Sequence, residues 1–248
     1  MCATLARARR HWLKQVPALV AVLVVLVTGC SSSRAETAKP SELAELLAQV
    51  RVAAASNAPG YDRACDRRHA CVFGPANTDD HAGLNGHNGC DGFNDLARSV
   101  MTDLVPSTGC VVRAGQWIDP YTGHPNRYVR GQLPTPTVEH VVALHTAWDR
   151  GASVWPQQRR IDFANDQQFN LLLVGGPVNA SKGDRSPSQW LPPLAAARCP
   201  YLVRYLQVSI RWDLPITPAD RDAISALVPT CQAPPGWTTW PQPTRSHT

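Results

Sequence analysis

The chain has 248 residues, of which 44% are hydrophobic and 17% are charged. This length and hydrophobic content suit one domain of ordinary size with its own core. The 22 prolines and the low charge argue against a helical bundle and predict a loop-rich α+β protein. Residues 1–29 carry four of the 24 Lys and Arg, which leaves 20 basic against 19 acidic residues in the rest, a net charge of +1. The composition therefore excludes a strong whole-protein field that attracts nucleic acid, and any such binding depends on a local basic patch.

The first 29 residues are typical of the signal peptide of a bacterial lipoprotein. A positive n-region precedes the apolar run 16–27, which is too short to span a bilayer comfortably. The run ends in Val27-Thr28-Gly29-Cys30, which resembles a lipobox, so we expect lipidation at Cys30 and a membrane anchor outside the cytoplasm, or secretion. A plain signal peptide and a retained N-terminal anchor helix are the alternatives. Arg9-Arg10 also resembles a twin-arginine motif, which leaves the export route open.

Six cysteines lie beyond the leader: Cys65, Cys71, Cys90, Cys110, Cys199 and Cys231. An even number in an exported chain predicts disulfides, and six cysteines allow fifteen pairings. The simplest pairing joins each cysteine to its neighbour: Cys65 to Cys71, Cys90 to Cys110, and Cys199 to Cys231. No Cys-x-x-Cys is present, which argues against a structural zinc site.

The beginning of the mature chain predicts a tether, one helix and a long loop. Residues 31–40 are polar, and Ser41 suits the N-cap of a helix over 41–55. Residues 59–95 are rich in Gly, Asn, Asp and His, which predicts an ordered loop held by cysteines.

The rest of the chain predicts short elements of both kinds. In chain order they are a helix over 94–105, a strand over 109–119, a turn at 120–123, a strand over 138–144, helices over 146–152 and 156–165, a strand over 171–174, a helix starting near Asn179, a helix over 194–212 interrupted at Pro200, and a helix over 217–227 capped by Thr217. The predicted organisation is a signal peptide at 1–29, a tether with a short helix at 30–60, a single disulfide-stapled domain at 61–231, and a Pro- and Trp-rich tail at 232–248.

The pair Glu139-His140 is the first indication of a functional site, because an acid and an imidazole lie there within an apolar strand-like run. Strand neighbours point to opposite faces, and an acid and an imidazole in such a run need partners. Alone, this pair is explained as well by a structural histidine. Asn170 comes directly before the apolar run 171–174, and Asn179 comes nine residues after Asn170, at the expected start of a helix.

The order of these pieces resembles the HNH, or ββα-metal (His-Me finger), nucleases. More narrowly, it resembles the HNH domain at the C-terminal end of GmrSD-type restriction endonucleases, which also occurs alone in exported actinobacterial proteins. The resemblance spans about residues 61–231. It includes the stretches Phe73-Gly74-Pro75-Ala76, His87-Asn88-Gly89-Cys90-Asp91, Asp119-Pro120-Tyr121-Thr122-Gly123, Ala147-Trp148, Gly151-Ala152, Phe163-Ala164-Asn165-Asp166, Ser181-Lys182-Gly183-Asp184 and Trp190-Leu191-Pro192-Pro193. It implies a ββα-metal core within a loop-rich, disulfide-stapled α+β domain.

The resemblance implies a role for each of five residues. His140 is the expected general base, and Glu139 and Asn179 are the expected ligands of one divalent ion, Mg²⁺ or Mn²⁺. Asn170 holds the two strands so that His140 is aimed, and Lys182 neutralises a backbone phosphate. Seen alone, Asn170 is explained by a turn, Asn179 by a helix cap and Lys182 by a solvated surface charge.

The sequence departs from the family pattern at two places. Glu139 stands where the family has Asp, and Gly92-Phe93 stands where the family has Thr-Arg, so an arginine that can hold phosphate is absent there. The leading hypothesis is a lipid-anchored endonuclease acting on nucleic acid, DNA rather than RNA, with no protein partner inferred. The alternatives are a non-catalytic envelope lipoprotein that keeps the fold for binding, and a small metalloprotein with another hydrolytic substrate.

The loop at 59–95 offers a separate possibility. His81 and His87 lie there beside Asp79, Asp80 and Asp91, which could hold a cation. A polar loop stapled by cysteines is the favoured interpretation.

Overall fold

The computed structural model describes residues 41–105 and 109–231. All described residues belong to one compact unit. The expected signal peptide, the lipidation site at Cys30, the tether and the tail at 232–248 lie outside the described residues. Within the described ranges, no helix is long and apolar enough to cross a membrane.

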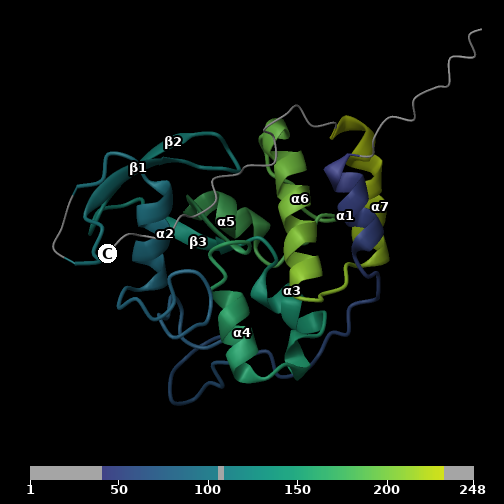
Figure 1. Cartoon of the computed structure of the whole chain (residues 1–248), viewed down its shortest axis with the longest axis horizontal. Coiled ribbons are helices and arrows are strands. Elements are labelled where there is room, and N and C mark those ends of the chain that lie inside the picture. The colour runs from purple at the N-terminus through teal and green to yellow at the C-terminus, as the bar shows by residue number, and fades with distance from the viewer. Residues whose placement is uncertain (1–40, 106–108, 232–248) are drawn as a thin grey trace, which may run out of the picture. The chain divides into compact units, whose positions relative to one another are not determined.

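Helices and two small sheets alternate along the chain (Figure 1). The helices are α1 (Glu42–Gln49), α2 (Gly92–Val100), α3 (Leu144–Asp149), α4 (Gln157–Ala164), α5 (Gly176–Lys182), α6 (Ala195–Arg211) and α7 (Pro218–Leu227), with single 3-10 turns at Ala152–Val154 and Val228–Thr230. The strands are β1 (Ala114–Ile118), β2 (Pro125–Val129), β3 (Pro136–His140) and β4 (Leu171–Gly175). β1 pairs with β2 and β3 with β4, both antiparallel. The expected mixed α+β class is confirmed.

Four elements differ from the expected ones. The first helix ends at Gln49, because the chain after it pairs with Ile216 through Ala53 N–H and through the Arg51 carbonyl. The strand expected to reach residue 144 ends at His140, and α3 begins at Leu144. Pro200 does not interrupt α6, which continues through it because its later turns are buried. β2 was not expected, since its sequence is polar and begins with proline.

The strand β4 lies between two hydrophobic cores. Leu171 and Leu173 pack with the β1–β2 hairpin, whereas Leu172 and Val174 belong to the larger core. Alternate strand residues point to opposite faces, so this burial pattern covers both faces of the β3–β4 pair. Helices α1, α6 and α7 run alongside one another in the larger core, on the other side of β3 from the hairpin (Figure 1). A strand pair buried on both faces gives the side chains at its end a fixed support.

The disulfides join neighbouring cysteines, as the simplest pairing predicted. They are Cys65–Cys71, Cys90–Cys110 and Cys199–Cys231. The first closes a loop of the long N-terminal segment, the second ties that segment to the chain before β1, and the third ties α6 to the end of the described domain. Each closes a loop of the unfolded chain and thereby reduces its entropy.

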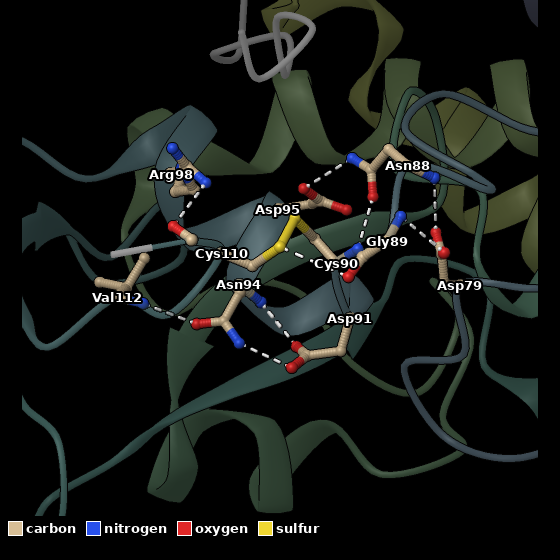
Figure 2. The surroundings of a disulfide bond; sticks show 11 residues. Asp79, Asn88, Gly89, Cys90, Asp91, Asn94, Asp95, Arg98, Cys110 and Val112 are labelled. Atoms are coloured by element: carbon tan, nitrogen blue, oxygen red, sulfur yellow. Dashed lines mark hydrogen bonds between the residues drawn. A yellow bond between two sulfur atoms is a disulfide. The ribbon is translucent and has the colours of Figure 1, made fainter. Parts of the chain in front are cut away.

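The polar loop uses its carboxylates to order its own backbone (Figure 2). Asp79 accepts hydrogen bonds from the backbone N–H groups of Asn88 and Gly89, and Asp91 caps α2. Asn94 donates to Asp91 and accepts from the N–H of Val112, so the loop, the helix and the chain after the Cys90–Cys110 disulfide are joined. These bonds account for the loop's composition and favour the stapled polar loop over a cation site.

Candidate active site

Glu139 and His140 are the last two residues of β3. Glu139 lies opposite Leu172 and His140 opposite Leu171 in the register with β4. The two side chains therefore start from opposite faces of the strand pair, Glu139 toward the larger core and His140 toward the hairpin side. Both nevertheless border one cleft, because it opens at the end of the strand.

His140 is held in one tautomer by its surroundings. Its Nε2 lies 2.9 Å from the carbonyl oxygen of Ala164. A carbonyl can only accept, so Nε2 carries the proton and the lone pair remains on Nδ1. Burial lowers the pKa of His140 to about 4, and the nearby charges of Arg63 and Lys182 act in the same direction. The imidazole is therefore neutral at pH 7 and can accept a proton at Nδ1.

Glu139 is a buried carboxylate with two side-chain partners. Its exposed fraction is 4%. Oε1 lies 2.7 Å from Nζ of Lys182 and accepts a hydrogen bond of 3.3 Å from the hydroxyl of Tyr121. Burial raises the pKa of Glu139, and the Lys182 ammonium opposes that rise. The ion pair accounts for how a carboxylate is accommodated at the edge of a hydrophobic core.

Lys182 corrects an expectation. It was predicted to contact a backbone phosphate, with a solvated surface charge as the alternative. Its side chain is instead fully buried, and Nζ contacts the Glu139 carboxylate and donates to the carbonyl of His140 at 2.9 Å. The ammonium therefore lies beneath the cleft as the counter-charge of Glu139.

Asn170 fixes the turn that follows β3. It is fully buried, and its Oδ1 accepts a hydrogen bond of 2.9 Å from the N–H of Val142, while its backbone carbonyl accepts from the N–H of Val141. Its Nδ2 donates to the carbonyl of Phe163 at 3.4 Å. One side chain thus links the turn after His140 to the end of α4, whose Ala164 carbonyl receives the imidazole.

The cleft at the end of β3 has a volume of 420 Å³. Glu139, His140 and Asn179 border it, with Asn179 coming from α5 and the exposed Asp184 from the loop after α5. The structure thus brings three of the five predicted residues to one cleft and places Asn170 and Lys182 behind it.

The donors at the cleft suit a hard cation in chemical type. Carboxylate and amide oxygens from Glu139, Asn179 and Asp184 are the ligand atoms that Mg²⁺ and Mn²⁺ take, with waters completing the shell. A carboxylate can accept at both oxygens, so the Lys182 contact does not exhaust Glu139. Within residues 41–105 and 109–231, no group of three or more His, Cys, Asp or Glu is arranged to hold a metal. Any ion at this cleft would therefore depend on amide and water oxygens.

Two features of the cleft were not expected from the sequence. Arg63 borders it beside His140, although it comes from the segment just before the Cys65–Cys71 disulfide loop. Tyr61 also borders it, stacked on His145 with ring centroids 4.3 Å apart, and His145 Nδ1 lies 3.5 Å from an oxygen of Asp184. Tyr61 and Arg63 lie in a loop far from the strand in sequence and follow no periodic pattern, so nothing in the sequence alone would have identified them.

Comparison with known proteins agrees with the suggested family. The model of the family described as "GmrSD restriction endonucleases, C-terminal domain" matches residues 110–227, which include β3, β4 and α5. An uncharacterized secreted protein of Arthroderma benhamiae is 32% identical over 143 residues, covering 57% of this chain and 68% of that protein. A comparison with solved structures gives no match. The chain therefore belongs to the family of the C-terminal domain of GmrSD restriction endonucleases.

Proposed function

We propose that the protein is a metal-dependent endonuclease that hydrolyses phosphodiester bonds of DNA. The observation that carries this proposal is the meeting of a neutral imidazole, a carboxylate and an amide oxygen at one cleft, from His140, Glu139 and Asn179. The family to which the chain belongs supports the same class of reaction.

We assign β3, β4 and α5 to the ββα core of such a nuclease. β3 and β4 are antiparallel, and α5 begins directly after β4 and contacts both strands. In this assignment β3 presents Glu139 and His140, while α5 presents Asn179. The long segment between the strands carries α3 and α4, and α4 supports the imidazole through Ala164.

The mechanism begins with proton transfer to His140. Nδ1 takes a proton from water, whose oxygen forms a bond to phosphorus as the bond to the leaving sugar oxygen breaks. The Nε2 contact with Ala164 keeps the imidazole in the accepting tautomer, and Asn170 fixes the turn that carries it. Glu139 and Asn179 would hold the Mg²⁺ or Mn²⁺ ion, which supplies polarisation of the phosphate and stabilisation of the leaving oxygen.

We place this activity outside the cytoplasm, with the chain lipid-anchored through Cys30. Three disulfides are typical of an oxidising compartment, and the Arthroderma benhamiae relative is described as secreted. A Cys30→Ala variant expressed in the native host would test the anchor. We expect it to leave the membrane fraction, whereas continued membrane association would contradict lipidation at this residue.

The nuclease proposal is tested by incubating the oxidised protein with supercoiled plasmid, and separately with circular single-stranded DNA, in Mg²⁺, Mn²⁺ or EDTA. We expect nicking with either metal, none in EDTA, and loss of nicking in His140→Ala. His69→Ala is the matched control, because His69 is exposed on the Cys65–Cys71 loop. Absence of nicking by properly oxidised protein in every metal, or full activity of His140→Ala, would refute the proposal.

Binding without cleavage is the second candidate function. The specific observation in its favour is the ammonium of Lys182, 2.7 Å from the carboxylate proposed to bind metal. A fixed positive charge beside Glu139 lowers its attraction for a cation. Nucleic acid binding that is the same in Mg²⁺ and EDTA, without any cleavage, would favour this candidate.

A further inference from the structure

A second hollow meets the cleft at His140. It has a volume of 310 Å³ and shares the bordering residues Arg63, Thr137, Val138 and His140 with the cleft. The remaining border is formed by the polar loop, by the start of α2 and by the end of α4, through Ala76, Asn77, Phe93, Ala164 and Asn165, together with Pro136 of β3. A group bound in this hollow is therefore adjacent to any phosphate at His140.

Arg63 presents a positive charge at the boundary of the two hollows. Its Nη1 donates to the carbonyl of Gly74 at 2.7 Å, which uses one of the five N–H donors of the guanidinium. Among the described residues, no carboxylate lies within ion-pair distance of Arg63. The planar guanidinium matches the oxygens of a phosphate better than an ammonium does. The Cys65–Cys71 disulfide and the Gly74 contact keep this arginine at the cleft.

Phe93 supplies an aromatic ring to the border of the second hollow. It is half-buried near the start of α2, and the ring of Tyr128 packs against it edge to face, with centroids 5.7 Å apart at 70°. This packing fixes the ring while leaving part of it exposed at the hollow. Every nucleobase has a face that can stack on such a ring, whatever its sequence.

The size of the hollow favours one nucleotide over a duplex. Pockets that enclose small molecules have volumes of roughly 300–1,000 Å³, and 310 Å³ lies at the lower end. A base that remains paired and stacked in a duplex cannot enter it without being flipped out. The net charge of +1 beyond the leader also lacks the broad field on which duplex binding depends.

We propose that this hollow binds the nucleotide next to the cleaved phosphate, with Arg63 on its phosphate and its unpaired base on Phe93, so that the substrate class is single-stranded nucleic acid. The inference rests on the proposed nuclease function only for the identity of the neighbouring phosphate. The nucleotide site itself is defined by an arginine and an aromatic ring that border the same hollow.

Binding in EDTA separates this inference from cleavage. Fluorescence anisotropy of the full oxidised protein would use a labelled ten-nucleotide oligothymidine and a labelled duplex of the same length. We expect the single strand to bind at least tenfold more tightly than the duplex. Phe93→Leu and Arg63→Gln should each weaken single-strand binding about tenfold, as expected for losing one stacked base or one phosphate contact.

Two matched controls keep the result interpretable. Phe93→Tyr retains the ring and should bind within about twofold of the parent protein. Arg67→Gln removes an exposed charge from the neighbouring Cys65–Cys71 loop and should do the same. Thermal unfolding would check that each variant is folded. If Arg63→Gln does not fold, the comparison of Phe93→Leu with Phe93→Tyr, and of single strand with duplex, still tests the proposal. Equal affinity for duplex and single strand, or unchanged binding by folded Phe93→Leu, would overturn the proposal. Selective single-strand binding by a protein that nicks nothing in metal would instead refute only the nuclease proposal.

Discussion

Replacing Lys182 by Met would leave the Glu139 carboxylate without its ammonium partner. Glu139 has an exposed fraction of 4%, and Lys182 is fully buried, so water cannot substitute for the lost contact. Breaking a buried ion pair from one side costs about 3–5 kcal/mol, because the other charge remains unpaired. The Tyr121 hydroxyl stays bonded to Glu139, and the raised pKa of Glu139 allows it to take up a proton. We therefore expect the free energy of unfolding of Lys182→Met to fall by about 3 kcal/mol.

Urea unfolding of the oxidised protein, without nucleic acid or metal, measures this loss by linear extrapolation. Arg185→Met is the matched control, because Arg185 is an exposed cation three residues later and should change the free energy by less than about 0.5 kcal/mol. The double variant Glu139→Gln with Lys182→Met should recover part of the loss, since neither charge is then left alone. A loss below about 1 kcal/mol in Lys182→Met would refute the buried pair and restore the phosphate role for this lysine.

Two further predictions concern buried hydrogen bonds. Asn170→Ala removes the acceptor of the buried Val142 N–H, so the free energy of unfolding in urea should fall by about 1–3 kcal/mol. Nicking by the still-folded protein should also fall, because the turn after His140 is released. Unchanged values of both quantities would contradict the positioning role. Asp220→Asn should lower the free energy of unfolding at pH 7 by about 3 kcal/mol. Burial alone would raise the pKa of Asp220, but the bonds from Ser186 and Arg150 outweigh it and lower the pKa. The stabilisation by the Asp220 carboxylate is therefore complete above the unfolded pKa of about 3.9 and disappears as the pH falls through the lower folded pKa. In urea titrations, the difference in free energy of unfolding between Asp220→Asn and the parent protein should shrink below about pH 4. A difference that stays constant with pH would refute this reasoning.

Elements whose signals lie within a few residues could be predicted from the sequence. The capping box of α7 joins Thr217 and Asp220, three residues apart, and it forms as expected. The apolar run before Gly175 becomes β4, since the run is short and both of its faces are buried. The disulfides follow the simplest pairing because each joins cysteines that are neighbours in the chain.

The surroundings of the charged residues could not be predicted in the same way. Lys182 was expected near phosphate, yet its partner Glu139 lies on another element, and only the packing of α5 on β3 brings the two together. Arg63 was missed because its place beside His140 depends on the path of a loop, which no periodic pattern describes. A surface charge and a buried charge look alike in a sequence, and the difference is decided by tertiary contacts.

Glu139 stands where the resemblance predicts Asp, and its contact with Lys182 gives this difference a specific consequence for metal binding. Glu139→Asp would withdraw the carboxylate from Nζ by about 1.5 Å, one carbon–carbon bond, and so weaken a contact that is now 2.7 Å. The carboxylate would then be less neutralised by the ammonium and attract a cation more strongly. We expect the Mg²⁺ concentration for half-maximal nicking to fall several-fold while the free energy of unfolding falls by about 1–2 kcal/mol. A rise in the required Mg²⁺, with the same loss of stability, would mean that Lys182 holds Glu139 in position for the ion rather than competing with it.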